Sequence, residues 1–304
     1  MAERVRRRAI VTAVACAVLL CVVHQLAVRT RAGQAFEDAV LDAHLATAAE
    51  PHARTAVRAL RGVSVFSLAG AITAVFAIGM LRRRPALGVT SAGLIAAAVL
   101  ATEIAKLLVV RPLLLESGVH REDQSFPSGH TAVAMSVMCG LALVAPYRMR
   151  VAAIFAGSLW AIGIAVATVT GNYHRPSDTL GAELITLVCV CAAIVPLTRH
   201  GVRQAPPKAG RAGRRLLAAG YAVTAAAALA IAAVRQDVFT AGWAIALAGG
   251  CLTTLTLLAL LGTADLAGPA ERPAPRPRSA SARGRDFPDR CTAVTETVIL
   301  DYAT

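Results

Sequence analysis

The sequence predicts an all-α fold in the form of a polytopic membrane helix bundle. Of the 304 residues, 56% are hydrophobic and 16% are charged. Most hydrophobic residues lie in long runs without polar alternation, and a helix needs about 20 mostly apolar residues to cross a bilayer. Strands of a membrane barrel would alternate polar and apolar residues instead. Eight runs fit membrane-spanning helices, at about residues 9–28, 63–81, 86–110, 129–146, 151–170, 179–198, 216–234 and 239–264.

These runs divide the chain into four parts. The first six runs, within residues 1–198, form the core. A basic cytoplasmic linker over 199–215 leads to two additional transmembrane helices within 216–266, which we expect to be a peripheral addition. Residues 267–304 are rich in Pro, Arg, Ser and Ala and bury too little apolar surface to offset the entropy of ordering. They predict a disordered cytoplasmic tail.

The formal net charge is +13, but the distribution of the basic residues indicates a membrane topology and not a nucleic-acid partner. If the N-terminus is inside and eight crossings follow, 21 of the 31 Lys and Arg residues fall in the inner segments. Both termini are then cytoplasmic, and the two polar segments described below face the extracytoplasmic side. The abundance of Arg and Ala is typical of bacteria with GC-rich genomes, so we expect the plasma membrane.

The first apolar run follows four arginines, as the core of a signal peptide would. Its apolar part is longer than the roughly 7–15 residues of such a core, and no small-residue cleavage pattern follows it. We therefore expect a retained membrane anchor.

A long predicted outer loop, residues 29–62, carries apolar residues at helical spacing with acidic residues between them. This pattern predicts an amphipathic helix on the outer membrane surface, and a solvated helical connector without a ligand is the alternative. The apolar residues are Phe36, Val40, Leu41 and Leu45, and the acidic ones are Glu37, Asp38 and Asp42.

Residues 125–131, Ser-Phe-Pro-Ser-Gly-His-Thr, stand where a polar loop meets the fourth apolar run. The first N–H groups of a helix lack internal partners and carry the positive end of the helix dipole, an arrangement that binds phosphate. Gly129 lets the backbone approach an oxyanion, Ser128 can donate its hydroxyl, and His130 can protonate a departing alkoxide. These residues predict a phosphate site, with a capping turn and an incidental histidine as the alternative.

A second polar segment contains His174 and Asp178, four residues apart at the start of the sixth run. A carboxylate one turn from an imidazole can accept its N–H and raise its basicity, which leaves the other nitrogen free to attack phosphorus. A purely structural role for Asp178 at the helix N-terminus is the alternative. Lys106 and Glu103 lie near the outer end of the third run, where an ionisable group predicts function. A Glu–Lys pair that only holds helices together is the alternative there.

Taken together, residues 103–181 resemble the type 2 phosphatidic acid phosphatase (PAP2) family, whose fold vanadium-dependent haloperoxidases share. The resemblance covers roughly residues 60–198 and implies a six-helix core that the first helix completes. It implies that His174 is a nucleophile that becomes phosphorylated, that Asp178 is its partner and that His130 is the general acid. Ser128 and Gly129 would hold phosphate with their backbone, and Lys106, Arg111 and Arg175 are candidate phosphate-binding residues.

The first family motif is altered in this chain. Only four residues separate Lys106 from Arg111-Pro112, where the family has six, and Leu113 occupies the expected arginine position. Five residues along a helix rotate a side chain by about 140°. Arg111 can therefore reach the phosphate only if the helix ends or bends near Pro112.

The third family motif is altered as well. Ala167 and Thr168 stand where the family has Ser-Arg, so one phosphate-clamping arginine is missing. Arg121 and Arg175 are candidates to compensate for it. Because phosphoryl transfer depends mostly on positioning and positive charge, this loss bears directly on activity.

The predicted function is a membrane-embedded phosphatase, a hydrolase that acts on a phosphate monoester or diphosphate of a lipid through a phosphohistidine intermediate. The family resemblance implies substrates of the phosphatidic acid, phosphatidylglycerol phosphate or polyprenyl diphosphate type. The expected partners are this lipid phosphate and the membrane lipids, and no metal or cofactor is expected, since the cysteines show no metal spacing. The alternative is a non-catalytic lipid-phosphate-binding membrane protein that retains the fold, which Leu113 and Thr168 favour.

Overall fold

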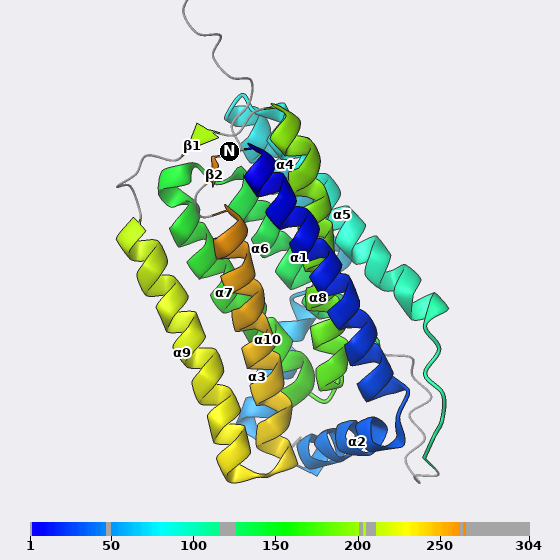
Figure 1. Cartoon of the computed structure of the whole chain (residues 1–304). Coiled ribbons are helices and arrows are strands. Elements are labelled where there is room, and N and C mark those ends of the chain that lie inside the picture. The colour runs from blue at the N-terminus through cyan, green and yellow to red at the C-terminus, as the bar shows by residue number, and fades with distance from the viewer. Residues whose placement is uncertain are drawn as a thin grey trace, which may run out of the picture. The chain divides into compact units, whose positions relative to one another are not determined.

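Ten α-helices make up most of the described part of the chain in the computed structural model (Figure 1). The structure describes residues 2–46, 50–115, 126–200, 203–204, 211–261 and 264–265, all within the unit Met1–Ala270, and the predicted tail lies outside them. The all-α prediction is therefore confirmed. The helices are α1 (Ala2–Val23), α2 (Arg31–Ala46), α3 (Pro51–Arg61), α4 (Val65–Leu81), α5 (Pro85–Leu108), α6 (Gly129–Val144), α7 (Tyr147–Thr170), α8 (Pro176–Leu197), α9 (Arg211–Arg235) and α10 (Val238–Leu261).

Four short elements complete the described part. The π-helical turn η1 (His24–Val28) continues α1, and the 3-10 turn η2 (Thr198–His200) follows α8. Two-residue strands β1 (Arg203–Gln204) and β2 (Ala264–Asp265) pair antiparallel.

Local sequence explains where five of the helices start. Pro51, Pro85 and Pro176 occupy the first turns of α3, α5 and α8, where a missing N–H costs nothing. Ser64 caps α4 by accepting the Ser67 N–H at 3.2 Å, and Ser128 caps α6 by accepting the Thr131 N–H at 3.4 Å.

Eight of the described helices correspond to the eight predicted apolar runs, and two of these eight are short. Six are long and apolar enough to cross a membrane, namely α1 with η1, α5, α7, α8, α9 and α10. The helix α4 has 17 residues and continues α3 across a 61° bend, and α6 has only 16. At 1.5 Å per residue, α6 rises about 24 Å, less than the hydrocarbon core of about 30 Å.

The last helix, α10, is central to the bundle, so the expectation of a peripheral addition was wrong for it. Buried residues make up 67% of its apolar window, the same share as in α8, against 17% in α9 and 11% in α1. Two glycines allow this packing: a Cβ on Gly249 would collide with Glu183 of α8, and one on Gly250 would lie 2.7 Å from Ile162 of α7. A helix that is apolar on every side gives no sequence signal of which face it buries.

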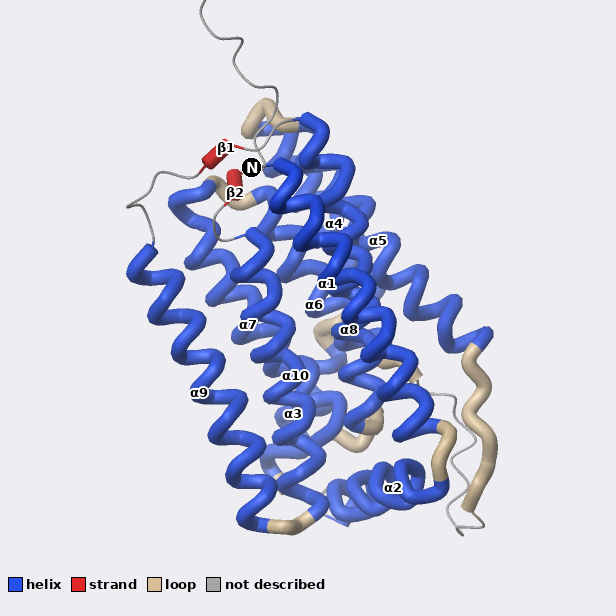
Figure 2. The backbone as a smooth tube through the Cα atoms, in the orientation of Figure 1, coloured by secondary structure: helices blue, strands red, loops and turns tan. Residues whose placement is uncertain are grey.

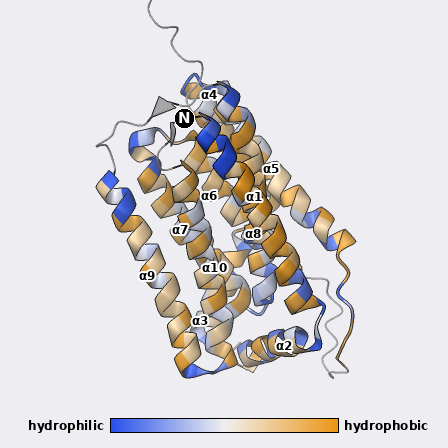
Figure 3. Ribbon diagram, in the orientation of Figure 1, coloured by the Kyte–Doolittle hydropathy of each residue, from blue (hydrophilic) through white to orange (hydrophobic). Residues whose placement is uncertain are grey.

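The two ends of the bundle differ in character. Short α2 lies across the direction of the longer helices at the end where α6 and α8 begin (Figures 1 and 2). The opposite end is basic: Arg4, Arg7 and Arg8 of α1 lie beside the last turns of α10, and Arg150 Nε donates to the Ala142 carbonyl at 3.1 Å. Hydrophilic colouring marks the starts of α1 and α9 there, whereas the helix bodies are mainly hydrophobic (Figure 3).

Candidate active site

The first turns of α6 and α8 are joined directly. The Ser128 N–H donates to the Asp178 carbonyl at 2.8 Å, so the capping residue of α6 is fixed to the first turn of α8. Phe126 lies against Gly181, where an added Cβ would be 2.7 Å from the Phe126 ring. Only glycine fits at this contact, which brings the two predicted motifs together.

The two predicted catalytic histidines face each other at this junction. His130 lies in the first turn of α6, and His174 lies in the turn that connects α7 to α8. Their ring centroids are 6.1 Å apart with an interplanar angle of 62°. The His174 backbone N–H donates to the Thr168 carbonyl at 3.0 Å, which anchors the turn. A phosphorus atom held between the rings would be within reach of both side chains.

Asp178 is positioned for both of the roles that the sequence left open. It is completely buried, and its Oδ2 accepts the Arg175 backbone N–H at 2.9 Å, which caps α8. The same oxygen lies 3.5 Å from His174 Nδ1. The carboxylate therefore faces Nδ1 of the imidazole.

Lys106 reaches the start of α6 as one half of an ion pair. Its Nζ lies 2.7 Å from Glu103 Oε1, one turn earlier in α5. A Cβ placed on Gly129 would be 3.1 Å from each of these two atoms. Lys106 is also close enough to His130 to act on it electrostatically. The absence of a side chain at Gly129 therefore leaves room for the Lys106 ammonium beside the helix N-terminus.

Arg111 lies beyond the end of α5. This meets the condition that the helix must end or bend near Pro112 for Arg111 to reach the phosphate. The helix α5 ends at Leu108, and Arg111 lies in the extended segment that follows it (Figure 2). Its Nη2 lies 2.7 Å from Glu37 Oε2 of α2. Its buried Nη1 has no hydrogen-bond partner in the part of the chain that the structure describes. One edge of the guanidinium is thus held, and one buried donor is unused.

Glu37 connects Arg111 to the start of α8. Only 1% of this residue is exposed, and its Oε1 accepts the Ser177 backbone N–H at 3.0 Å. Burial raises the pKa of the Glu37 carboxyl, the nearby Asp178 charge raises it further, and Arg111 opposes the rise. Because Glu37 is paired and hydrogen-bonded, its burial is compensated.

Arg175 also pairs with α2. Its Nε and Nη2 donate to Asp38 Oδ1 at 3.3 and 3.0 Å, and the arginine is 6% exposed. Thr168, at the position of the missing family arginine, turns its hydroxyl back to the Ala165 carbonyl at 2.7 Å. The neighbouring acidic residues of α2 therefore each hold one of the two predicted phosphate-binding arginines.

The role of α2 is what the sequence interpretation missed. Gln34 belongs to the same face: its Nε2 donates to the Pro112 carbonyl at 2.6 Å, and its Oε1 accepts the Leu114 N–H at 3.2 Å. The sequence predicts an amphipathic helix here but assigns no partners to its acidic residues. Glu37 is buried together with Val40 and Leu41, and the spacing of apolar and acidic residues along the helix does not predict this burial.

The structure thus links all eight predicted site residues, either directly or through α2. Arg121 and Ser125 lie outside the described residues. Among the residues that the structure describes, no three His, Cys, Asp or Glu side chains form a cluster that could hold a metal ion. An anion at this site would meet backbone amides, two imidazoles and basic side chains.

Comparison with known proteins gave a family but no individual relative. No curated protein and no solved structure matches the chain. Residues 58–201 match the model of the PAP2 superfamily, which generally comprises phosphatases. The matched segment includes α4 to α8 and every predicted site residue. Residues 58–201, somewhat less than half of the chain, are therefore similar to the PAP2 superfamily.

Proposed function

We propose that this protein is a lipid phosphatase that hydrolyses a phosphate monoester or diphosphate of a membrane lipid through a phosphohistidine. The observation that carries the proposal is the pair of imidazoles, 6.1 Å apart, at the N-terminus of α6, with the Asp178 carboxylate behind one of them. A single incidental histidine would not create this arrangement. Nucleophile, orienting carboxylate and general acid are the three groups that phosphoryl transfer to an imidazole requires.

In the first step, His174 Nε2 attacks the phosphorus atom. The Nδ1–H remains directed at Asp178, which stabilises the positive charge that develops on the ring. A P–N bond forms and the P–O bond to the lipid breaks, while protonated His130 gives its proton to the departing oxygen. The N–H groups of α6, Lys106 and the free Nη1 of Arg111 would stabilise the charge on the equatorial oxygens.

In the second step, His130, now neutral, takes a proton from water as the water oxygen attacks phosphorus. The P–N bond breaks, His174 is regenerated and inorganic phosphate leaves. Glu37 and Asp38 do not touch the phosphate in this scheme. They act through Arg111 and Arg175, and we assign them as positioning residues.

A lipid phosphate suits the depth of the site. The helix α6 is about 6 Å shorter than the hydrocarbon core, so its N-terminus is recessed if its other end lies at the membrane surface. A headgroup entering sideways from the bilayer reaches such a recess without leaving the lipid. The arginines of α1, Arg148 and Arg150 gather at the opposite end, so the positive-inside rule supports a site on the extracytoplasmic side of the plasma membrane with both termini cytoplasmic.

The test is phosphate release and trapping of the intermediate. Purified protein in detergent would be given phosphatidic acid, phosphatidylglycerol phosphate and a polyprenyl diphosphate, each carrying radioactive phosphorus in its terminal phosphate. We expect release from at least one lipid, and a rapid quench should leave label on the protein that is stable in alkali and labile in acid. His174→Ala should lose both signals. Label on a different residue, or unchanged release by His174→Ala, would refute the mechanism.

A second candidate function is a lipid-phosphate binder without turnover. The observation that favours it is the missing clamp: Thr168 bonds its own helix and Leu113 is 70% exposed. Tight binding of one of these lipids with no release and no labelled protein would support this candidate instead.

A further inference from the structure

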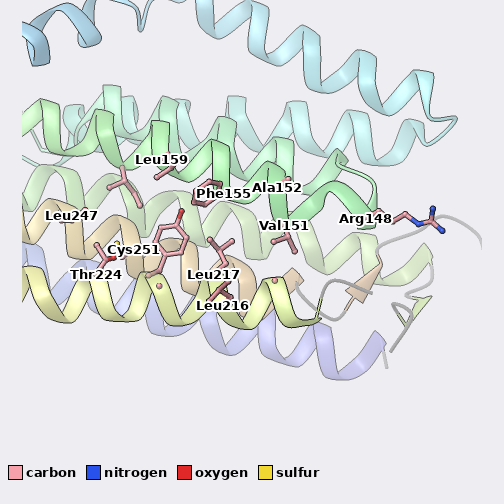
Figure 4. Close-up of a pocket in the computed structure, with 14 residues that line it drawn as sticks. Arg148, Val151, Ala152, Phe155, Leu159, Leu216, Leu217, Thr224, Leu247 and Cys251 are labelled. Carbon is pink, nitrogen blue, oxygen red and sulfur yellow. The ribbon is translucent and has the colours of Figure 1, made fainter. Parts of the chain in front are cut away.

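An apolar groove separates α7 from α9, away from the candidate active site (Figure 4). Its volume is about 740 Å³. It exists because α9 packs mainly on α10 and has little contact with α7. The groove walls include Phe155 and Leu159 from α7 and Leu216 and Leu217 from α9, and Cys251 of α10 contributes to the lining.

Two hydroxyl groups cross the groove. Ser158 of α7 and Tyr221 of α9 share a hydrogen bond. This contact ties α9 to the bundle and pairs both hydroxyl groups. The remaining lining residues, among them Val151 and Leu247, are mainly apolar. Such a surface favours an aliphatic chain.

The groove is about as long as one leaflet of a bilayer. Its lining runs from Arg148 to Ile162 on α7 and from Gly213 to Thr224 on α9. At 1.5 Å per residue these stretches span about 21 and 17 Å, and half of a hydrocarbon core is about 15 Å. An acyl chain that enters at Arg148 would therefore lie within a single leaflet.

The mouth of the groove is positively charged. Arg148 lines it, and Arg211 and Arg215 are exposed on either side of Gly213, another lining residue. Within the described part of the chain, no acidic side chain forms an ion pair with Arg148. This mouth lies where α6 ends and α7 begins, the opposite end from Gly129 and His130.

We propose that the groove between α7 and α9 binds one acyl chain of an anionic phospholipid, with the phosphate of its headgroup at Arg148, Arg211 and Arg215. The charged mouth selects an anionic headgroup, and the leaflet-long apolar lining accepts the chain. This lipid is a bound component that fills the space between α9 and the bundle. It is not the substrate, since it sits at the basic end.

Glycine substitutions provide a clean test. Gly220 lines the groove, and a Cβ there would meet no atom within 4 Å, so Gly220→Leu fills the groove without a backbone clash. Gly93 of α5 is also exposed, helical and free of atoms within 4 Å, which makes Gly93→Leu the matched control. Gly213→Leu is a second filling variant, because its nearest atom would be 3.9 Å away.

The measurement is native mass spectrometry of the purified full-length chain, titrated with phosphatidylglycerol or phosphatidylcholine of identical acyl chains. We expect one tightly bound phosphatidylglycerol, held at least about tenfold more tightly than phosphatidylcholine. Gly220→Leu and Gly213→Leu should weaken both lipids by more than about tenfold, and Gly93→Leu should change neither. Arg148→Gln should weaken only phosphatidylglycerol, by about fivefold.

Three outcomes would overturn the proposal. Unchanged phosphatidylglycerol binding by both groove-filling variants would place the bound lipid elsewhere. Equal affinity for the two headgroups would remove the role of the arginines. A dimer that Gly220→Leu dissociates, without any bound lipid, would show that a second copy of the chain covers the groove.

Discussion

The N-termini of α6 and α8 and the polar face of α2 contribute to the same site in different ways. His130, His174 and Asp178 lie on or beside two adjoining helix starts, and each has a reactive atom in the site. Glu37 and Asp38 lie 74 and 137 residues from the arginines that they bind. In the proposed mechanism the first group takes part in the reaction, and the second supplies fixed counter-charges. Substitutions in the two regions should therefore fail in different ways.

The largest expected effect is the loss of the nucleophile. We expect His174→Ala to reduce kcat by at least about 10⁴-fold while lipid binding remains, because the P–N bond of the proposed mechanism forms at His174. Phosphate release and lipid binding would be measured on the same preparation. Loss of binding and release together would instead point to a collapsed site.

The loss of the general acid should depend on the leaving group. For a phosphate monoester the departing group is an alkoxide, and His130→Ala should cost about 10²- to 10⁴-fold in kcat. For a diphosphate the departing group is a phosphate, a much weaker base, and the loss should be at least about tenfold smaller. Rates on paired monoester and diphosphate lipids would show this ratio, and an equal loss on both would exclude His130 as the proton donor.

Asp178→Asn separates the two roles of this residue. The amide oxygen can still accept the Arg175 N–H, so the start of α8 should be retained, but the negative charge facing His174 Nδ1 is lost. We expect kcat to fall by about 10²- to 10⁴-fold with little change in thermal stability. A large loss of stability with normal kcat per folded molecule would show that capping is its main role.

The same comparison explains which parts were predictable from the sequence. A capping serine, a glycine and a histidine at a helix start are local features, and so is His174 four residues before Asp178. The partners of Arg111 and Arg175 depend on how α2 lies across the bundle, which no local spacing specifies. The 140° rotation expected for Arg111 on a continuous helix does not apply, because α5 ends at Leu108. The central place of α10 depends on contacts at Gly249 and Gly250 that an evenly apolar run conceals.

The acidic pair of α2 allows a matched test of positioning. Glu37 is 1% exposed, whereas the Asp38 side chain is 29% exposed. Glu37→Gln keeps an acceptor for the Ser177 N–H but leaves Arg111 as a buried, uncompensated cation, which should cost about 3 kcal/mol of stability. Asp38→Asn should cost about 1 kcal/mol or less, because solvent screens the pair.

Activity should distinguish positioning from stability in these two variants. If the acidic residues orient the arginines, both substitutions should raise the KM for the lipid phosphate by about 10-fold or more per folded molecule. Glu37→Asp, which keeps the charge, should recover part of the loss. Unchanged KM in both variants, with only the melting temperature affected, would assign α2 a structural role alone.

The smallest expected effect is a pH dependence of stability centred on Glu37. Burial and Asp178 raise the pKa of this carboxyl, and Arg111 opposes the rise. A raised pKa means that the folded state binds the proton more tightly than the unfolded state, so the free energy of unfolding falls as pH rises from the unfolded pKa to the folded one. Arg111→Gln removes the opposing charge and should extend this fall to higher pH.

We therefore expect the melting temperature of Arg111→Gln to drop between pH 5 and pH 8 by about 2–4 °C more than that of the wild type, the equivalent of about 1 kcal/mol. The double variant Arg111→Gln/Glu37→Gln should lose the additional pH dependence, because its buried group no longer titrates. If the single and double variants show the same pH dependence, then the titrating group is not Glu37, and the buried pair joining α2 to the segment after α5 does not act as a unit.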